Sequence, residues 1–419
     1  MLTEAKNENR RTKWPVELGP ALLAVLTWLG PGDIIEATVA GGNYGYSLLW
    51  VLALAVAMRF AMVSMISKYH LCNVHGEGVI NGLRRLHSMV PFLLGVSCVV
   101  MAHAYCSYMT AAMGELGVAY VGFGNKMAWA TIAVAVGLIF VVRPTYRRFL
   151  LFFRFCLALL VVTVLGAALW SGPELEPLAL GLVGFSIPRD FGAFGVLLVA
   201  LSMSGAISGS VSNFIYPHLL AERGWSNAGH RKLQQYDLMI GVVFLFLFNL
   251  AMWIIGATQL NPTGKSVSNL IEIPKVLEPI IGPYGCKFFA LGMAAAVFTS
   301  LIGFAHCLGG LADRCFAVWN DKPSQGAGTV YHVVSISAIT TSLVWSTPGM
   351  PGSLQMALVV NCAQIVLVPL LAVCVWTLTA RKEFIGEQYK NCWWENLLMA
   401  VLTCLAIYGA VGAVRALVA

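Results

Sequence analysis

Long apolar segments alternate with short polar ones along the whole chain. A helix needs about 20 mostly apolar residues to cross a membrane, and eleven segments meet or approach this length. They cover residues 20–41, 47–67, 92–120, 127–142, 149–170, 193–218, 236–257, 285–311, 331–347, 354–379 and 396–417. The pattern therefore predicts an all-α polytopic membrane protein in which each segment is one span.

The composition agrees with this prediction. The chain has 419 residues, of which 58% are hydrophobic and 11% charged, whereas soluble domains carry about 25% charged residues. Residues 1–19 are polar and basic and lack an apolar core followed by a small-residue cleavage site, so we expect no cleaved signal peptide. We expect a cytoplasmic segment at 1–19 and a single transmembrane domain at 20–419 within a lipid bilayer.

The loops predict the orientation. If the N-terminus is cytoplasmic, most lysines and arginines outside the spans fall in cytoplasmic segments, as the positive-inside rule requires. We therefore expect a multi-pass protein of a bacterial plasma membrane, with its N-terminus inside and its C-terminus outside. The net charge of +7 reflects these loops, and we expect no nucleic-acid partner. The cysteines lie mostly within spans, without a CxxC pair, and are interpreted as small core residues.

The first span is interrupted by polar and helix-breaking residues. Gly30, Pro31 and Gly32 disfavour a continuous helix, and Asp33 and Glu36 follow directly. A charged residue inside a membrane costs roughly 2.5–3.5 kcal/mol on insertion scales. Broken backbone next to buried acids is typical of a cation site near the membrane midplane. The alternative is a simple kink, in which the carboxylates cap the new turn or pair with a basic residue.

The sixth span carries a second run of small and polar residues between positions 205 and 213. Glycine lowers helix stability by about 1 kcal/mol per residue, and serine and asparagine compete with the backbone for hydrogen bonds. The residues concerned are Gly205, Ser208, Gly209, Ser210 and Asn213. We interpret this run as a second break in a helix; close packing of small residues against another helix is the alternative.

The two interruptions lie five spans apart. Broken helices at matching positions of two halves are the sequence sign of inverted repeats with a binding site between them. We therefore expect an inverted five-plus-five repeat, with helices 1 and 6 broken at the midplane. Repeat one would cover about 20–170 and repeat two about 193–379, and an extra helix would cover about 396–417.

At these residues the chain resembles the Nramp family of divalent-metal transporters, which share the leucine-transporter fold. The resemblance runs over nearly the whole chain and is strongest over Leu18–Leu52, which matches the first span, a tight turn and the entry to span two. The segment Tyr146–Phe149, at the start of span five, is also similar to the family. The resemblance implies the leucine-transporter fold and a divalent metal ion as substrate.

The chain departs from the family pattern at both interruptions. The family's first-span motif is Asp-Pro-Gly-Asn, whereas residues 30–33 read Gly-Pro-Gly-Asp. The family's sixth-span Met-Pro-His motif does not occur here, and we align it with Ser208–Asn213. A Tyr-Pro-His sequence ends at His218, near the inner end of span six, where we interpret the histidine as an interfacial residue. These departures make the chain most similar to the Nramp-related magnesium transporters.

The candidate ligands then decide which ion we expect. A thioether sulfur selects softer metals, whereas oxygen donors suit Mg²⁺, Ca²⁺ and Mn²⁺. The donors expected here are all hard, with Asp33 as the principal ligand. The candidate metal-binding residues are Asp33, Glu36, Gly30, Gly205, Ser208, Gly209, Ser210, Asn213, Asn361 and Gln364. Such a site fits a partly hydrated Mg²⁺ held by one or two carboxylates, as substrate, and no cofactor is expected.

Proton coupling needs a chain of titratable groups. The resemblance implies an acid-rich third span, an arginine in span nine and a histidine in span six for proton-coupled members. Here span three offers His103 and Glu115, and span nine has no arginine or lysine. We name His103 and Glu115 as a candidate proton pathway, and hydrogen-bonded structural residues as the alternative. We therefore predict weak or absent proton coupling.

The sequence thus predicts facilitative import of Mg²⁺, and also Mn²⁺, by alternating access. One alternative is a proton-coupled Mn²⁺ or Fe²⁺ transporter with a rebuilt site. Another is a symporter of the same fold for an organic cation or an amino acid. An intramembrane enzyme would need a nucleophile–base pair or HExxH within the spans, and neither occurs. The sequence leaves the oligomeric state open, with a monomer as one possibility.

Overall fold

The computed structural model describes residues 20–21, 31–142, 147–189, 194–209, 211–263, 267–323 and 327–418. The described elements are all helical. In the first half they are α2 (Pro31–Tyr44), α3 (Leu49–Cys72), α4 (Val79–Leu86), α5 (Met89–Val121), α6 (Lys126–Val142), α7 (Arg147–Trp170) and α8 (Leu175–Val183). The second half begins with α9 (Val196–Ser208), η1 (Val211–Ile215), α10 (Tyr216–Glu222), η2 (Ala228–His230), α11 (Arg231–Gln259), η3 (Asn261–Thr263) and α12 (Glu272–Val276). It continues with α13 (Glu278–Trp319), α14 (Thr329–Thr341), η4 (Ser342–Ser346), α15 (Ser353–Ala363), η5 (Gln364–Leu367), α16 (Val368–Ala380), α17 (Lys382–Ile385), η6 (Glu387–Tyr389) and α18 (Trp393–Val418).

The predicted spans from 47–67 to 396–417 each coincide with one or more helices, and α2 covers residues 31–41 of the first span, whose residues 22–30 lie outside the described part of the chain. Seven helical segments in the described residues are long and apolar enough to cross a membrane, and two shorter apolar ones lie at Lys126–Val142 and Leu160–Trp170. The spans expected at 193–218 and 354–379 are each interrupted by a 3₁₀ segment, η1 and η5. The prediction of a break in span six is confirmed, because α9 ends at Ser208.

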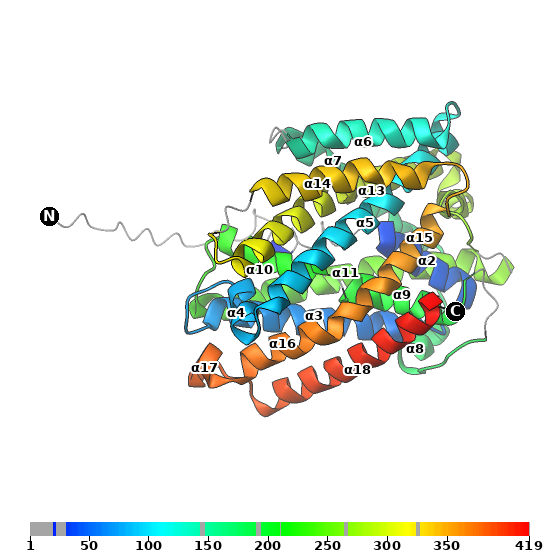
Figure 1. Cartoon of the computed structure of the whole chain (residues 1–419). Coiled ribbons are helices and arrows are strands. Elements are labelled where there is room, and N and C mark those ends of the chain that lie inside the picture. Colours follow the sequence, from blue (N-terminus) through cyan, green and yellow to red (C-terminus); the bar gives the residue numbers. More distant parts are fainter. Residues whose placement is uncertain are drawn as a thin grey trace.

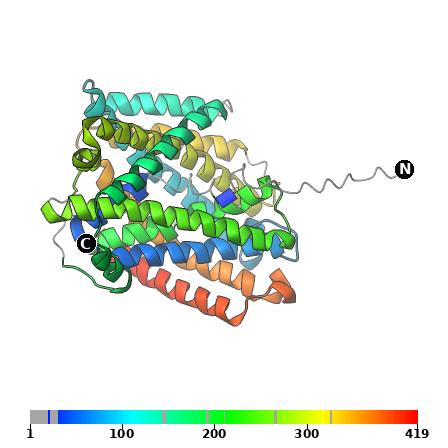
Figure 2. The same cartoon turned by 180° about the vertical axis from the view of Figure 1, so that it is seen from behind.

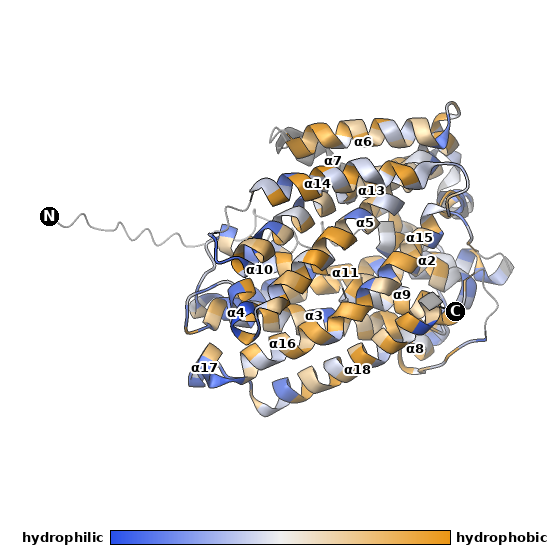
Figure 3. Ribbon diagram, in the orientation of Figure 1, coloured by the Kyte–Doolittle hydropathy of each residue, from blue (hydrophilic) through white to orange (hydrophobic). Residues whose placement is uncertain are grey.

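The helices form a bundle with α6 and α14, which are in contact, on one side and α16 and α18, also in contact, on the other (Figure 1). The view from behind shows α11 running beside α3 (Figure 2), and these two helices are in contact. Apolar residues dominate the long helices, and polar residues gather at α4 and α17 (Figure 3). The short helix α2 lies inside this bundle, packed against α9, α11 and α15.

The contact between α2 and α11 depends on two glycines. A Cβ atom at Gly41 would lie 2.2 Å from the carbonyl oxygen of Trp253. On the other side, a Cβ atom at Gly256 would lie 2.5 Å from the carbonyl oxygen of Thr38. Only glycine permits two backbones to approach so closely. The glycines therefore fix the depth at which α2 sits in the bundle.

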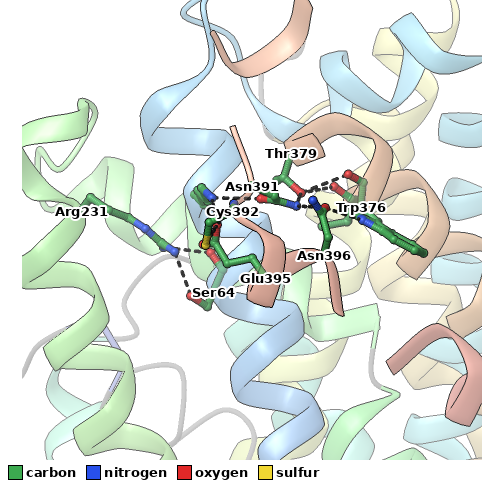
Figure 4. Close-up of polar contacts among 10 residues, drawn as sticks. Ser64, Arg231, Trp376, Thr379, Asn391, Cys392, Glu395 and Asn396 are labelled. Carbon is green, nitrogen blue, oxygen red and sulfur yellow. Dashed lines mark hydrogen bonds and ion pairs between the residues drawn. The ribbon is translucent and has the colours of Figure 1, made fainter. Parts of the chain in front are cut away.

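One end of the bundle carries α4, α10 and α17 together (Figure 1). Near this end, Lys68 of α3 donates to Glu395 Oε2 at 2.6 Å and to Asn391 Oδ1 at 2.9 Å. Arg231 donates to the Ser64 carbonyl at 2.9 Å, and Figure 4 shows the surrounding polar network. These bonds tie α18 and α11 to α3. We call this end the basic end.

Two features go beyond the predicted spans. After the span predicted at 47–67, α3 ends at Cys72, and the polar segment that follows contains a separate helix, α4. The turn between them is fixed by Asn73, whose side chain accepts from the backbone amides of His75 and Glu77. The loop after span five also contains a helix, α8, which was not predicted. Its length of nine residues is too short for the span criterion.

Candidate cation site

Helix α2 is described from Pro31 onward, and the residues directly before it, 22–30, lie outside the described part of the chain. Asp33 follows in the first turn, where the helix dipole stabilises a negative charge. Glu36 lies three residues later and therefore on the same face. Asp33 is 3% exposed and Glu36 is 1% exposed, so two acidic side chains are buried at the start of α2.

Asp33 is held from α11. The side-chain amide of Asn249 donates to Asp33 Oδ1 at 3.3 Å and to the Leu245 carbonyl at 3.0 Å. Asn249 is itself buried in a predominantly apolar helix. The second bond, within α11, keeps the amide oriented toward α2. The bond from Asn249 thus fixes the orientation of the Asp33 carboxylate.

Glu36 joins α2 to α9 and α15. Its Oε1 accepts a bond from Ser202 Oγ and another from Asn361 Nδ2 at 2.6 Å. Gly32 permits this approach, because a Cβ atom there would lie 2.8 Å from Asn361 Nδ2. Among the described residues, Glu36 Oε2 has no hydrogen-bond partner although it is fully buried. A buried carboxylate oxygen without a partner is costly in a protein and is the kind of atom that a cation satisfies.

The network continues from Asn361 to the third span. Gln364 Nε2 donates to Asn361 Oδ1 at 3.2 Å, and Tyr105 of α5 donates through its hydroxyl to Gln364 Oε1. Gln364 is the first residue of η5, where α15 changes to 3₁₀ geometry. The helix interruption in span ten therefore places amides from two consecutive turns beside α2. The sequence named Asn361 and Gln364 but did not predict this interruption.

The carbonyl oxygens at the break in span six are already engaged. The Gly205 carbonyl accepts from the Gly209 N–H at 3.0 Å, and the Ser208 carbonyl accepts from Asn213 Nδ2 at 3.0 Å. Each keeps a second lone pair for a further donor or a cation. Asn213 Oδ1 is buried without a partner in the described residues. Gly205 has an additional role in packing, since a Cβ atom there would lie 1.8 Å from the Asn361 carbonyl oxygen.

A buried arginine also enters the site. Arg59 of α3 is 1% exposed, and its Nη2 donates to the Ala206 carbonyl of α9 at 2.9 Å. Its positive charge interacts electrostatically with Asp33. The site thus combines two acidic side chains with one permanent cation.

The structure does not bring every candidate residue to this place. Gly30 and Ser210 lie outside the described residues. His103 contacts Thr341 Oγ1 at 2.8 Å and accepts from Trp345 Nε1 at 3.2 Å. Both partners lie on α14 or η4, so His103 joins α5 to the ninth span.

Glu115 occupies the other end of α5. It pairs with Lys126 at 3.0 Å and accepts the first N–H of α15, from Ser353, at 3.0 Å. A carboxylate at this position compensates unpaired N–H groups at a helix start. In the described residues, no contact joins His103 or Glu115 to Asp33 or Glu36.

Sequence reasoning missed three residues of the site, namely Asn249, Ser202 and Arg59. A signal was present for two of them. Asn249 is a polar residue in the middle of span seven, and Arg59 is a charged residue inside span two. Polar groups at such positions usually face the bundle interior. Ser202 gave no comparable signal, because serine also serves in close helix packing.

Comparison with known proteins decides the family. The model of the family described as "Natural resistance-associated macrophage protein-like" matches residues 21–414. The chain belongs to the Nramp family. It is 24% identical over 294 residues to the divalent metal cation transporter MntH of Bacillus subtilis, covering 68% of this chain and 67% of the relative. It is 27% identical over 305 residues to MntH of Erwinia tasmaniensis, covering 70% of this chain and 71% of the relative.

Solved structures show the fold. A manganese transporter of Eremococcus coleocola, in complex with an aromatic bis-isothiourea compound, superposes with a TM-score of 0.69 at 16% identity, over 94% of this chain and 86% of that one. The transporter MhsT, in complex with L-phenylalanine, superposes with a TM-score of 0.56 at 14% identity, over 96% and 99%. This Nramp protein therefore has the leucine-transporter fold that the sequence predicted. It is a membrane transporter and not an enzyme.

Proposed function

We propose that this Nramp protein imports Mg²⁺, and also Mn²⁺, by alternating access and without obligatory proton coupling. The unpartnered Oε2 of Glu36 carries the proposal. It lies in a fully buried site whose other side chains donate or accept through oxygen and amide groups. Hard donors and one or two carboxylates suit Mg²⁺ and Mn²⁺.

The proposed roles follow from the contacts. Asp33 is the principal ligand, because it lies in the first turn of α2, where the helix dipole favours a negative charge, and Asn249 holds its orientation. Glu36 supplies the second acidic oxygen and connects the ion to α9 and α15 through Ser202 and Asn361. Movement of α2 and α9 relative to the surrounding helices would then change both the ligand set and the side from which the site is open.

Uncoupled import has sufficient driving force. The membrane potential is worth about 2.3 kcal/mol per charge per 100 mV, so a divalent ion gains about 4.6 kcal/mol. That energy corresponds to accumulation of more than about a thousandfold. The contacts of His103 and Glu115 fit structural roles, since each residue joins α5 to a neighbouring helix. We therefore propose no proton pathway through His103 and Glu115.

A proton-coupled transporter of Mn²⁺ or Fe²⁺ is the second candidate. Two observations favour it. Cys362 is buried and directly follows Asn361, which donates to Glu36, and sulfur is a soft donor that suits transition metals. The curated relatives are also named as divalent metal cation transporters, and the structural relative as a manganese transporter.

The two candidates are separated by flux into proteoliposomes. The purified full-length protein is reconstituted, Mg²⁺ and Mn²⁺ uptake are measured at a fixed inside-negative potential, and internal pH is followed. The proposal predicts uptake of both ions without acidification. Mn²⁺ uptake with acidification and no Mg²⁺ uptake would contradict it and support the second candidate. If neither ion enters, an organic cation or an amino acid should be tested as substrate.

A further inference from the structure

Arg59 is the feature that a simple cation site does not explain. A charged side chain in the membrane interior is costly and usually functional. Arg59 is nevertheless among the largest fully buried side chains of the protein. An arginine near a cation site reduces the affinity of that site by charge repulsion. Its retention at this place therefore needs a function of its own.

The guanidinium of Arg59 lies among groups of the kind that coordinate a cation. Its guanidinium donates to the Ala206 carbonyl, two residues before α9 ends at Ser208. The C-terminal end of a helix carries a partial negative charge. Transporters with broken helices use such ends and their unwound carbonyls to coordinate cations. Asp33 contributes the nearby full negative charge.

We propose that Arg59 is a built-in counter-cation of the transport site. Its guanidinium balances the carboxylate of Asp33 when the carrier is empty, and an arriving divalent cation must compete with this charge. The inference rests on the proposed function, because it assumes that a cation binds beside Asp33. The new element is that Arg59 supplies the positive charge when no metal ion is bound.

The formal charges show what Arg59 changes. With Asp33 ionised, Arg59 makes the pair neutral when the site is empty. Without Arg59, the Asp33 carboxylate would be an uncompensated negative charge in the empty site. An uncoupled importer must return empty through the membrane in every cycle. Since an uncompensated buried charge is costly, Arg59 lowers the energy of the return step.

Two consequences are measurable. Removing the charge by Arg59→Met should tighten cation binding, because the competing charge is gone. We expect the Mn²⁺ concentration for half-maximal thermal protection to fall by about tenfold, within the usual range for two coupled sites. Net uptake should nevertheless fall, because the empty carrier returns slowly. Exchange of external labelled Mn²⁺ for internal unlabelled Mn²⁺ needs no empty return and should remain close to wild type.

The experiment compares three variants of the full-length protein with the wild type. Arg59→Met removes the charge at similar length, and Arg59→Lys keeps the charge. Arg231→Met is the matched control, since Arg231 also donates to a main-chain carbonyl, that of Ser64 in α3, but lies at the basic end. We expect Arg59→Lys and Arg231→Met to keep the wild-type ratio of exchange to net uptake. Arg59→Met should raise this ratio by about tenfold or more.

The inference is overturned if Arg59→Met leaves Mn²⁺ affinity unchanged and lowers exchange and net uptake in parallel. If wild-type protein shows neither Mn²⁺ nor Mg²⁺ flux or thermal protection, it is the proposed function that fails. The pairing of Arg59 with Asp33 is then tested by the unfolding midpoints of the variants in the absence of metal. Arg59→Met should destabilise the wild type more than it destabilises Asp33→Asn, and equal effects would exclude the pairing. If Arg59→Met alone does not fold, recovery of folding in the double variant supports the inference, and failure to recover excludes it.

Discussion

Substitution of Gly205 by alanine tests how α9 positions the site. The added Cβ atom would lie 1.8 Å from the carbonyl oxygen of Asn361. A carbon and a carbonyl oxygen normally approach no closer than about 3.3 Å. Helix α15 must therefore move away from α9 by about 1.5 Å, the difference between these distances, or α9 must bend by a similar amount.

The same movement breaks the bond that holds Glu36. The Asn361 Nδ2 to Glu36 Oε1 distance of 2.6 Å would rise to about 4 Å, beyond the range of a hydrogen bond. A lost bond to a charged group costs about 1.5–3 kcal/mol, and overpacking costs about 1–3 kcal/mol. Together they predict a loss of about 2.5–6 kcal/mol in the free energy of unfolding.

Thermal unfolding of the detergent-solubilised protein measures this effect. We expect Gly205→Ala to lower the unfolding midpoint by about 3–7 °C and to abolish Mn²⁺ uptake. Gly166→Ala in α7 is the matched control, because no atom lies within 4 Å of the added Cβ, and alanine should stabilise the helix by about 1 kcal/mol. Wild-type stability and uptake in Gly205→Ala would refute the argument that close packing at this glycine positions Asn361.

Three further substitutions test other parts of the structure. Asn249→Leu removes the amide that orients the principal ligand and should weaken Mn²⁺ binding, measured by titration, about tenfold or more. Lys68→Met leaves Glu395 as a buried charge without its lysine partner and should lower the free energy of unfolding by about 3–5 kcal/mol. Replacing both residues by apolar ones should cost less stability. Unfolding midpoints of the single and double variants measure this difference. The hydrogen bond from Arg84 lowers the pKa of the exposed Asp321. The ion pair therefore stabilises the folded protein above about pH 4, and this stabilisation is lost as the pH falls through the lowered pKa. The difference in unfolding midpoint between wild type and Asp321→Asn should be present at pH 7 and shrink toward pH 3.

The fold could be predicted from the sequence because lipid imposes a simple rule. Every span must be an apolar helix of sufficient length, so the hydrophobic pattern located the eleven spans. The pattern did not predict α8, because a helix of nine residues is too short for a rule based on membrane thickness. The turn before α4 depends on the side chain of Asn73, and such local capping leaves the apolar pattern unchanged.

The site could be predicted only in part. Asp33 and Glu36 stood out because acidic residues are rare inside spans and because they directly follow the helix-breaking residues 30–32. The pattern did not show which face of each helix meets α2. The contacts of Asn249, Ser202 and Arg59 depend on how deeply the helices pack, which Gly41, Gly256 and Gly205 set through their lack of a side chain. Those distances arise only from the assembled bundle.

Binding of Mn²⁺ to the purified protein tests the central claim most directly. The electron paramagnetic resonance signal of free Mn²⁺ is followed while the ion is titrated into wild type, Asp33→Asn and Asp313→Asn. Asp313 is a buried aspartate of α13, and in the described residues no contact joins it to Asp33 or Glu36. The account predicts saturable binding to wild type and Asp313→Asn, and a loss of affinity of more than about 100-fold in Asp33→Asn, beyond the effect of an outer-shell residue. Equal binding by wild type and Asp33→Asn would contradict it.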